Sequence, residues 1–258
     1  AHVVAPTDPA DNRIYIYGTG LDDTISVSKT AVIVSTLGAS AIPVDVAQSS
    51  LVYIEAGDGS DTIVVAATVN TPTILLGGEG NDELIGGSGP DVLIGGAGDD
   101  RLLGGAGGDT YEFVTDGVDL GSDTIFEFEN SGPADLLDFS GVVFAGPLGL
   151  TIDLRQQVIV DEPGVLTLSY GTTPPVEQIE NVRGTAFADV IWGNSLGNYI
   201  DGGAGDDTIF GGAGRDTILD GLGVNTVYGQ EDFDAEEVAD AALSDPLGLN
   251  PEFSLDST

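Results

Sequence analysis

Residues 77–112 read GGEGNDELI, GGSGPDVLI, GGAGDDRLL and GGAGGDTYE, four contiguous copies of a nine-residue pattern, GGxGxD followed by x-apolar-x. Two further copies, GGAGDDTIF and GGAGRDTIL, occupy residues 202–219. Within each block the period is nine residues without slippage. A short fixed period is the sequence signature of a solenoid, in which one small structural unit stacks on the next. These six copies therefore decide the fold.

Each copy combines a glycine-rich turn with a short strand. Three glycines in six residues permit positive φ angles and close approach of the backbone, so the turn can direct its carbonyls inward. The aspartate at the sixth position adds a carboxylate, and Ca²⁺ takes about 6–8 oxygen ligands of both kinds. The apolar eighth position builds a core, because side chains of a strand alternate between its faces. The pattern predicts calcium-binding turns joined by strands on both sides of a flattened coil.

Two copies complete one turn of this coil, so residues 18 positions apart are expected to stack. Each ion would then lie between two stacked sixth-position residues. Asparagine carries no charge, so we expect weaker sites where Asn198 and Asn225 occupy that position. The expected pairs are Asp82 with Asp100, Asp91 with Asp109, Asp189 with Asp207, and Asn198 with Asp216.

The tandem GGxGxD copies resemble the hemolysin-type repeats of the RTX (repeats-in-toxin) proteins, which fold around calcium. The resemblance implies an all-β fold, a parallel β-roll or β-helix solenoid, and carbonyls from the first four turn positions that complete each calcium shell. The candidate side-chain ligands, for roughly 5–9 ions, are Asp61, Asp82, Asp91, Asp100, Asp109, Asp123, Asp189, Asn198, Asp207, Asp216 and Asn225. The candidate backbone ligands are Gly77, Glu79, Gly80, Gly86, Ser88, Gly89, Gly95, Ala97, Gly98, Gly104, Ala106, Gly107, Gly202, Ala204, Gly205, Gly211, Ala213 and Gly214.

Degenerate copies extend the pattern beyond the perfect ones. GTGLDDTIS (18–26) and AGDGSDTIV (56–64) place Asp23 and Asp61 at the sixth position. TVNTPTILL (68–76) keeps the phase but has Thr73 there, so we expect that turn to lack a full calcium shell. The predicted organisation is a linker at 1–12, β-rich degenerate coils at 13–76, a first repeat block at 77–126, a β-rich insert at 127–183, a second block at 184–230, and an acidic tail at 231–258.

Two of these segments are expected to leave the repeat. NSGPADLLDFSG (130–141) breaks the phase, and the alternating residues that follow it predict strands and hairpins. In the tail, DAEEVADAALS (234–244) has helix-favouring composition and a proline shortly after it. We expect a short helix there that caps the open end of the solenoid, because every repeat array must protect its ends.

Composition restricts the partners and the chemistry. The chain has 43 acidic and 6 basic residues, a net charge of −37, which excludes nucleic acid and anionic lipid surfaces as partners. Its 41% hydrophobic content is too high for a disordered acidic chain, so counter-ions such as calcium are needed for it to compact. No apolar run reaches the roughly 18–20 residues of a membrane span, so no membrane insertion is expected.

Enzyme activity is not expected from this chain. The only histidine is His2, so neither a zinc-binding HExxH motif nor a Ser–His triad is present. A carboxylate pair of the glycosidase type stays open by inventory alone. However, most well-placed carboxylates belong to the turns, and the few basic residues do not cluster.

The ninth position of the second block carries aromatic residues. Trp192, Phe210 and Tyr228 are 18 residues apart, so they are expected to stack on one outer face. Ile85 and Leu103, with Ile94 on the opposite face, give the first block a similar apolar surface. Exposed apolar ladders usually mark an interface. Packing against the tail or a second chain is the favoured interpretation, and a platform for a surface glycan is the alternative.

These observations predict a calcium-binding structural module of a bacterial protein that is secreted or lies at the cell surface. It would be unfolded at low cytosolic calcium and would fold outside the cell. The resemblance implies export through a type I channel, which passes unfolded chains. The alternative function is an adhesin or surface-layer segment whose outer faces bind glycan or neighbouring chains.

Overall fold

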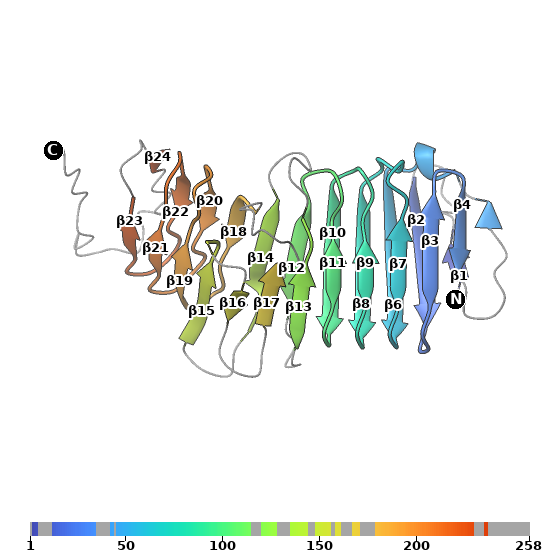
Figure 1. Cartoon of the computed structure of the whole chain (residues 1–258), viewed down its shortest axis with the longest axis horizontal. Coiled ribbons are helices and arrows are strands. Elements are labelled where there is room, and N and C mark those ends of the chain that lie inside the picture. The colour runs from blue at the N-terminus through green and yellow to red at the C-terminus, as the bar shows by residue number, and fades with distance from the viewer. Residues whose placement is uncertain are drawn as a thin grey trace.

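The computed structural model describes residues 2–4, 12–34, 42–43, 45–114, 120–127, 135–143, 148–155, 158–160, 167–170, 179–229 and 235–236. Their strands lie side by side along the long axis of the molecule, from β2–β7 at one end to β20–β23 at the other (Figure 1). Most neighbouring strands are parallel. The described part of the chain is therefore the all-β parallel solenoid that the repeats predict.

One wall of the solenoid is a long sheet that runs through both repeat blocks. In spatial order its eleven described strands are β1 (His2–Val4), β2 (Arg13–Thr19), β6 (Leu51–Asp58), β8 (Thr73–Glu79), β10 (Asp91–Ala97), β12 (Thr110–Val114), β14 (Leu136–Gly141), β18 (Asn181–Arg183), β20 (Tyr199–Asp201), β22 (Thr217–Leu219) and β24 (Ala235–Glu236).

The opposite wall consists of two shorter sheets. The strands of the nine-stranded sheet are β16 (Val158–Val160), β17 (Thr167–Tyr170), β13 (Ser122–Ile125), β11 (Arg101–Leu103), β9 (Glu83–Ile85), β7 (Thr62–Val65), β3 (Thr24–Ser28), β4 (Ala31–Val34) and β5 (Ile42–Pro43). The strands of the four-stranded sheet are β15 (Leu148–Asp153), β19 (Ala188–Trp192), β21 (Thr208–Phe210) and β23 (Thr226–Tyr228). A 3₁₀ turn spans Val46–Gln48.

The core follows from the eighth position of the repeat. Leu75 pairs with Leu93 in the long sheet, and Leu84 pairs with Leu102 in the nine-stranded sheet, each partner 18 residues further along the chain. These leucines are fully buried between the two walls. Because every coil repeats the same spacing, the apolar ladder fixes the register that places the turns above one another.

The insert continues the solenoid, contrary to the expectation that the chain leaves the repeat at 130–141. Strand β14 pairs in parallel with both β12 and β18. Arg183 in β18 also forms ion pairs with Asp138 of β14 at 2.7 Å and with Asp201 of β20 at 3.3 Å. One hairpin is present, where β16 and β17 are antiparallel. The phase is broken in sequence because the turns lengthen, while the coil itself persists.

The two chain ends also differ from expectation where they are described. His2–Val4, placed in the predicted linker, forms an edge strand antiparallel to β2. Ala235 and Glu236, placed in the predicted helix, form strand β24 beside β22, with Ala235 opposite Thr217. Ala235 lies 18 residues after Thr217, so the repeat phase prevails over helix propensity at this point. The remainder of 231–258 lies outside the described residues.

Candidate metal centres

The sixth-position residues form rows along the edges of the solenoid. In each row the backbone N–H of one residue donates a hydrogen bond to the side-chain Oδ1 of the next, one coil further on. The four predicted pairs are all brought together in this way, over N···O distances of 2.8 Å for Asp82 and Asp100, 2.9 Å for Asp91 and Asp109, 2.8 Å for Asp189 and Asp207, and 2.8 Å for Asn198 and Asp216.

The rows also include residues from degenerate turns. Asp61 bonds to Asp82 and Asp100 to Asp123 in the same manner, which extends the first row in both directions. The second row begins at Thr73, whose backbone N–H donates to Asp91 Oδ1 at 2.8 Å. It continues beyond Asp109 to Asp135, a residue that sequence reasoning missed. The available signal was the apolar strand that follows Asp135 directly, as in every true copy.

Several of these carboxylates have one oxygen without a hydrogen-bond partner. Burying a polar atom without a partner costs free energy, so each such oxygen indicates a missing interaction. The residues themselves are at most 2% exposed. The buried Oδ2 atoms that accept no hydrogen bond in the described structure include those of Asp61, Asp82, Asp100, Asp109 and Asp207.

The unpaired oxygens face a small space bordered by backbone carbonyls. A Cβ added to Gly77 would lie 2.2 Å from Asp82 Oδ2 and 2.5 Å from the carbonyl oxygen of Gly95 in the next coil. Glycine at the first position therefore leaves a space between a carboxylate oxygen and a carbonyl oxygen. These are the hard oxygen donors that Ca²⁺ prefers, and the residues present fit a calcium ion at this place.

Third-position carbonyls, also candidate ligands, already accept backbone hydrogen bonds. The Gly59 N–H donates to the carbonyl of Glu79, and the Gly80 N–H donates to that of Ala97, both over 2.8 Å. A carbonyl oxygen has two lone pairs, so each can accept this hydrogen bond and still ligate a cation.

Burial raises the pKa of the row carboxylates. Loss of water is the main cause, and repulsion from neighbouring carboxylates adds to it. The pKa is raised to about 7 at Asp82, Asp109 and Asp207 and to about 6 at Asp100. At Asp123 it is raised to about 8. Hydrogen bonds from the stacked backbone N–H groups oppose the shift only in part at Asp82 and Asp100. The rows therefore favour binding of a cation that neutralises them.

The turns fall into two kinds. In open turns, such as 77–82, the second and fourth glycines have positive φ, +123° at Gly78 and +124° at Gly80. In bonded turns the second-position N–H instead donates to the sixth-position side chain. The N···O distances are 2.7 Å from Thr19 to Asp23, 2.6 Å from Gly87 to Asp91, 2.6 Å from Thr185 to Asp189, and 2.9 Å from Asn194 to Asn198.

Sequence accounts for the bonded turns. Thr19, Thr185 and Asn194 replace the second glycine, and a residue with a Cβ is disfavoured at positive φ. In the turn 86–91 both glycines are present, but Pro90 stands at the fifth position. Proline pushes the residue before it toward extended backbone, and Gly89 does not adopt positive φ.

The two asparagines lie where predicted, and their amide nitrogens are engaged as donors. Asn198 Nδ2 donates to the carbonyl of Glu180, and Asn225 Nδ2 donates to that of Asp220. Only the amide oxygen of each residue can face a cation, and it carries no formal charge. This geometry agrees with weaker sites at both positions.

The aromatic ladder has the expected arrangement. The rings of Trp192 and Phe210 are stacked with centroids 5.3 Å apart, and those of Phe210 and Tyr228 are 4.7 Å apart. The Arg155 guanidinium lies 5.4 Å from the centroid of the Trp192 ring, at one end of the ladder. Tyr228, at the other end, is 49% exposed. Strand β24 of the tail pairs in the long sheet, not over this ladder.

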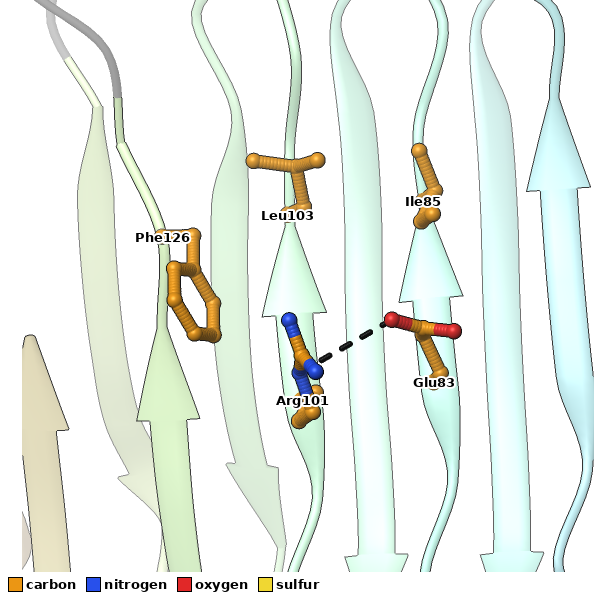
Figure 2. Close-up of a pocket in the computed structure, with 5 residues that line it drawn as sticks. All are labelled: Glu83, Ile85, Arg101, Leu103 and Phe126. Atoms are coloured by element: carbon orange, nitrogen blue, oxygen red, sulfur yellow. Dashed lines mark ion pairs between the residues drawn. The ribbon is translucent and has the colours of Figure 1, made fainter. Parts of the chain in front are cut away.

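The outer face of the first block carries a smaller apolar groove (Figure 2). Ile85 and Leu103, on β9 and β11, line it together with Phe126, which follows β13. Arg101 lies at its polar side, 3.7 Å from Glu83 and 4.7 Å from the centroid of the Phe126 ring. Ile94 lies on the other wall, in β10.

Comparison with protein-family models identifies four copies of the RTX calcium-binding nonapeptide repeat, at residues 76–111, 177–195, 183–218 and 201–235. These segments contain most of the open and bonded turns described above. No curated protein matches the chain closely enough to count as a relative. Among the described residues, no helix is long and apolar enough to cross a membrane.

Proposed function

We propose that this chain, which carries RTX calcium-binding nonapeptide repeats in segments 76–111 and 177–235, is a structural module of a secreted or cell-surface bacterial protein that folds on calcium binding. The observation that carries the proposal is the set of buried Oδ2 atoms without hydrogen-bond partners in open turns. Calcium supplies a divalent charge and a demand for oxygen ligands at these atoms.

The proposed ions lie between successive coils. For the ion between Asp82 and Asp100, both carboxylates and the carbonyls of the first glycines, Gly77 and Gly95, are the proposed ligands. The same assignment applies along each row, with the first, third and fourth turn positions as proposed backbone donors. Because each ion joins two coils, its binding free energy stabilises the interface between them.

Calcium is proposed to be required for folding, not merely tolerated. The row carboxylates are nearly inaccessible to solvent and lie one above another, so their ionised forms repel each other. The net charge of −37 adds repulsion over the whole narrow coil, and each bound ion removes two negative charges. At the low calcium concentration of the cytosol the chain stays expanded, which suits export of an unfolded chain.

The test is far-UV circular dichroism together with sedimentation velocity, first in excess EGTA and then during a calcium titration. We expect an expanded chain in EGTA and a compact β-rich monomer in calcium. Magnesium at the same concentration is the control, since it demands stricter octahedral geometry. A cooperative, native-like β spectrum that persists in excess EGTA would contradict the proposal.

The stacked ladder supports a second candidate function, an adhesin or surface-layer segment. Three coplanar rings ending in the exposed Tyr228 offer a flat surface to a sugar or to a second chain. Tyr228→Ala should weaken glycan binding on an array if the surface is a sugar platform. It should instead shift concentration-dependent sedimentation if the surface joins two chains. Ile94→Ala, on the opposite wall, is the control for both measurements.

A further inference from the structure

Three buried carboxylates from different parts of the chain meet where the first repeat block ends. Asp109 closes the last perfect turn of the block, Asp135 directly precedes β14, and Glu127 follows β13. One oxygen of each lies within 4.8 Å of the others, and all three residues are at most 2% exposed. Glu127 belongs to no GGxGxD turn, so the repeat pattern does not account for it.

The strand register places Glu127 at the position of a first glycine. Leu102 of β11 pairs with Ile125 of β13, and the Phe126 N–H donates to the Leu102 carbonyl. Counting on by two residues sets Glu127 beside Gly104 in the next coil. Phe126 lies on the outer groove in Figure 2, whereas Glu127 is buried.

An independent feature indicates a ligand at this place. Asp109 Oδ2 is buried and accepts no hydrogen bond. It is aimed at the first-position row, since a Cβ added to Gly104 would lie 2.4 Å from it. In the next coil of that row stands Glu127, whose carboxylate occupies the side where other turns have only glycine.

Tyr111 holds Glu127 in position. Its hydroxyl accepts a hydrogen bond from the Gly104 N–H at 2.8 Å and donates one to Glu127 Oε1. The Tyr111 side chain is fully buried, and burial together with Glu127 raises its pKa, so the phenol stays protonated as a donor. Metal-binding carboxylates are commonly oriented by such second hydrogen bonds.

We propose that Asp109, Glu127 and Asp135 form a three-carboxylate calcium site that joins the first repeat block to the following coil. A site between two turns of the pattern has two carboxylates, so this one adds a further negative charge. Calcium affinity rises with the number of charged ligands. This site therefore binds the tightest ion of its row, and Tyr111 is its positioning residue.

The test compares single variants of the full chain by equilibrium dialysis with ⁴⁵Ca²⁺, with circular dichroism as the measure of folding. Glu127→Gln keeps an acceptor for the Tyr111 hydroxyl but removes the charge, so it should lose one ion or weaken it roughly tenfold or more. Tyr111→Phe removes the hydrogen bond and keeps all three carboxylates, so it should retain the full ion count. The matched control is Glu55→Gln, since Glu55 is also bonded to a tyrosine hydroxyl, that of Tyr53, but is exposed.

Asp135→Asn provides a second route to the same site if Glu127→Gln fails to fold. The two variants and their double mutant should all lose the same single ion. Loss of two ions in the double mutant, or an unchanged ion count and midpoint in Glu127→Gln, would overturn the three-carboxylate site. Absence of any calcium-dependent folding in the wild-type chain is a different result, which contradicts the proposed function instead.

Discussion

The two rows of turns in the first block have nearly the same sequence pattern but different hydrogen bonding. In the first row, Asp61, Asp82 and Asp100 each keep a buried Oδ2 without a partner. In the second row, both oxygens of Asp91 accept hydrogen bonds, Oδ1 from Thr73 and the Asp109-facing coil's neighbour set aside, Oδ2 from Gly87. The unpaired oxygen appears there only at Asp109. A GGxGxD match therefore does not by itself define equal calcium sites, because the residues at its second and fifth positions decide whether the carboxylate is available.

The largest expected effect separates the two rows directly. Asp100→Asn removes a charge from an open turn with Asp82 and Asp123 on either side, so the calcium midpoint of folding should rise roughly tenfold or more. Asp91→Asn should cause a smaller rise, because backbone N–H and threonine donors already satisfy Asp91. Calcium titrations followed by circular dichroism measure both midpoints. Equal shifts in the two variants would show that the open and bonded turns do not differ in calcium binding.

A second effect, intermediate in size, concerns pH. The folded-state pKa values of about 7 at Asp82 and Asp109 and about 6 at Asp100 lie above the ordinary value of 3.8. A raised folded pKa means that the protonated carboxylate favours the fold at low pH, and that this stability is lost as the pH rises through about 4 to 7. Without calcium, the β signal should be stronger at about pH 5 than at about pH 8.

With calcium the order should reverse, because the metal binds ionised carboxylates and competes with protons. The calcium midpoint should therefore fall as the pH rises from about 5 to 8. Asp100→Asn serves as the control, since it removes one titrating group of the first row and should flatten both profiles. Calcium-free stability that increases toward pH 8 would contradict the burial of ionisable groups in that row.

The sequence predicted the stacking register and the rows because one spacing determines both. Leu84 over Leu102 and Asp82 over Asp100 follow from the same period of 18 residues. Glu127 could not be found in this way, because the chain between β13 and β14 is longer than a repeat and the phase is lost. Only pairing between β11 and β13 shows that Glu127 stands beside Gly104. Strand β14 escaped prediction for the same reason.

The bonded turns, in contrast, were visible in the sequence, since Thr185 and Asn194 replace glycine and Pro90 precedes Asp91. Their consequence depends on local backbone conformation, which a pattern of residue types does not express. A glycine permits positive φ but does not require it, and the following proline decides at Gly89.

The smallest expected effect tests that last point. Pro90→Ala removes the restriction on Gly89, so the turn 86–91 can adopt the open form with positive φ at Gly87 and Gly89. Asp91 Oδ2 would then be released from the Gly87 N–H, and the calcium midpoint should fall by about two- to threefold, equivalent to less than about 1 kcal/mol. Without calcium the same variant should be slightly less stable, by about 0.4–1 kcal/mol, because proline restricts the unfolded chain. Asn81→Ala, at the same fifth position of an open turn, is the matched control and should leave the turn open. A calcium midpoint that rises or stays unchanged in Pro90→Ala would mean that proline is not what holds this turn in the bonded form.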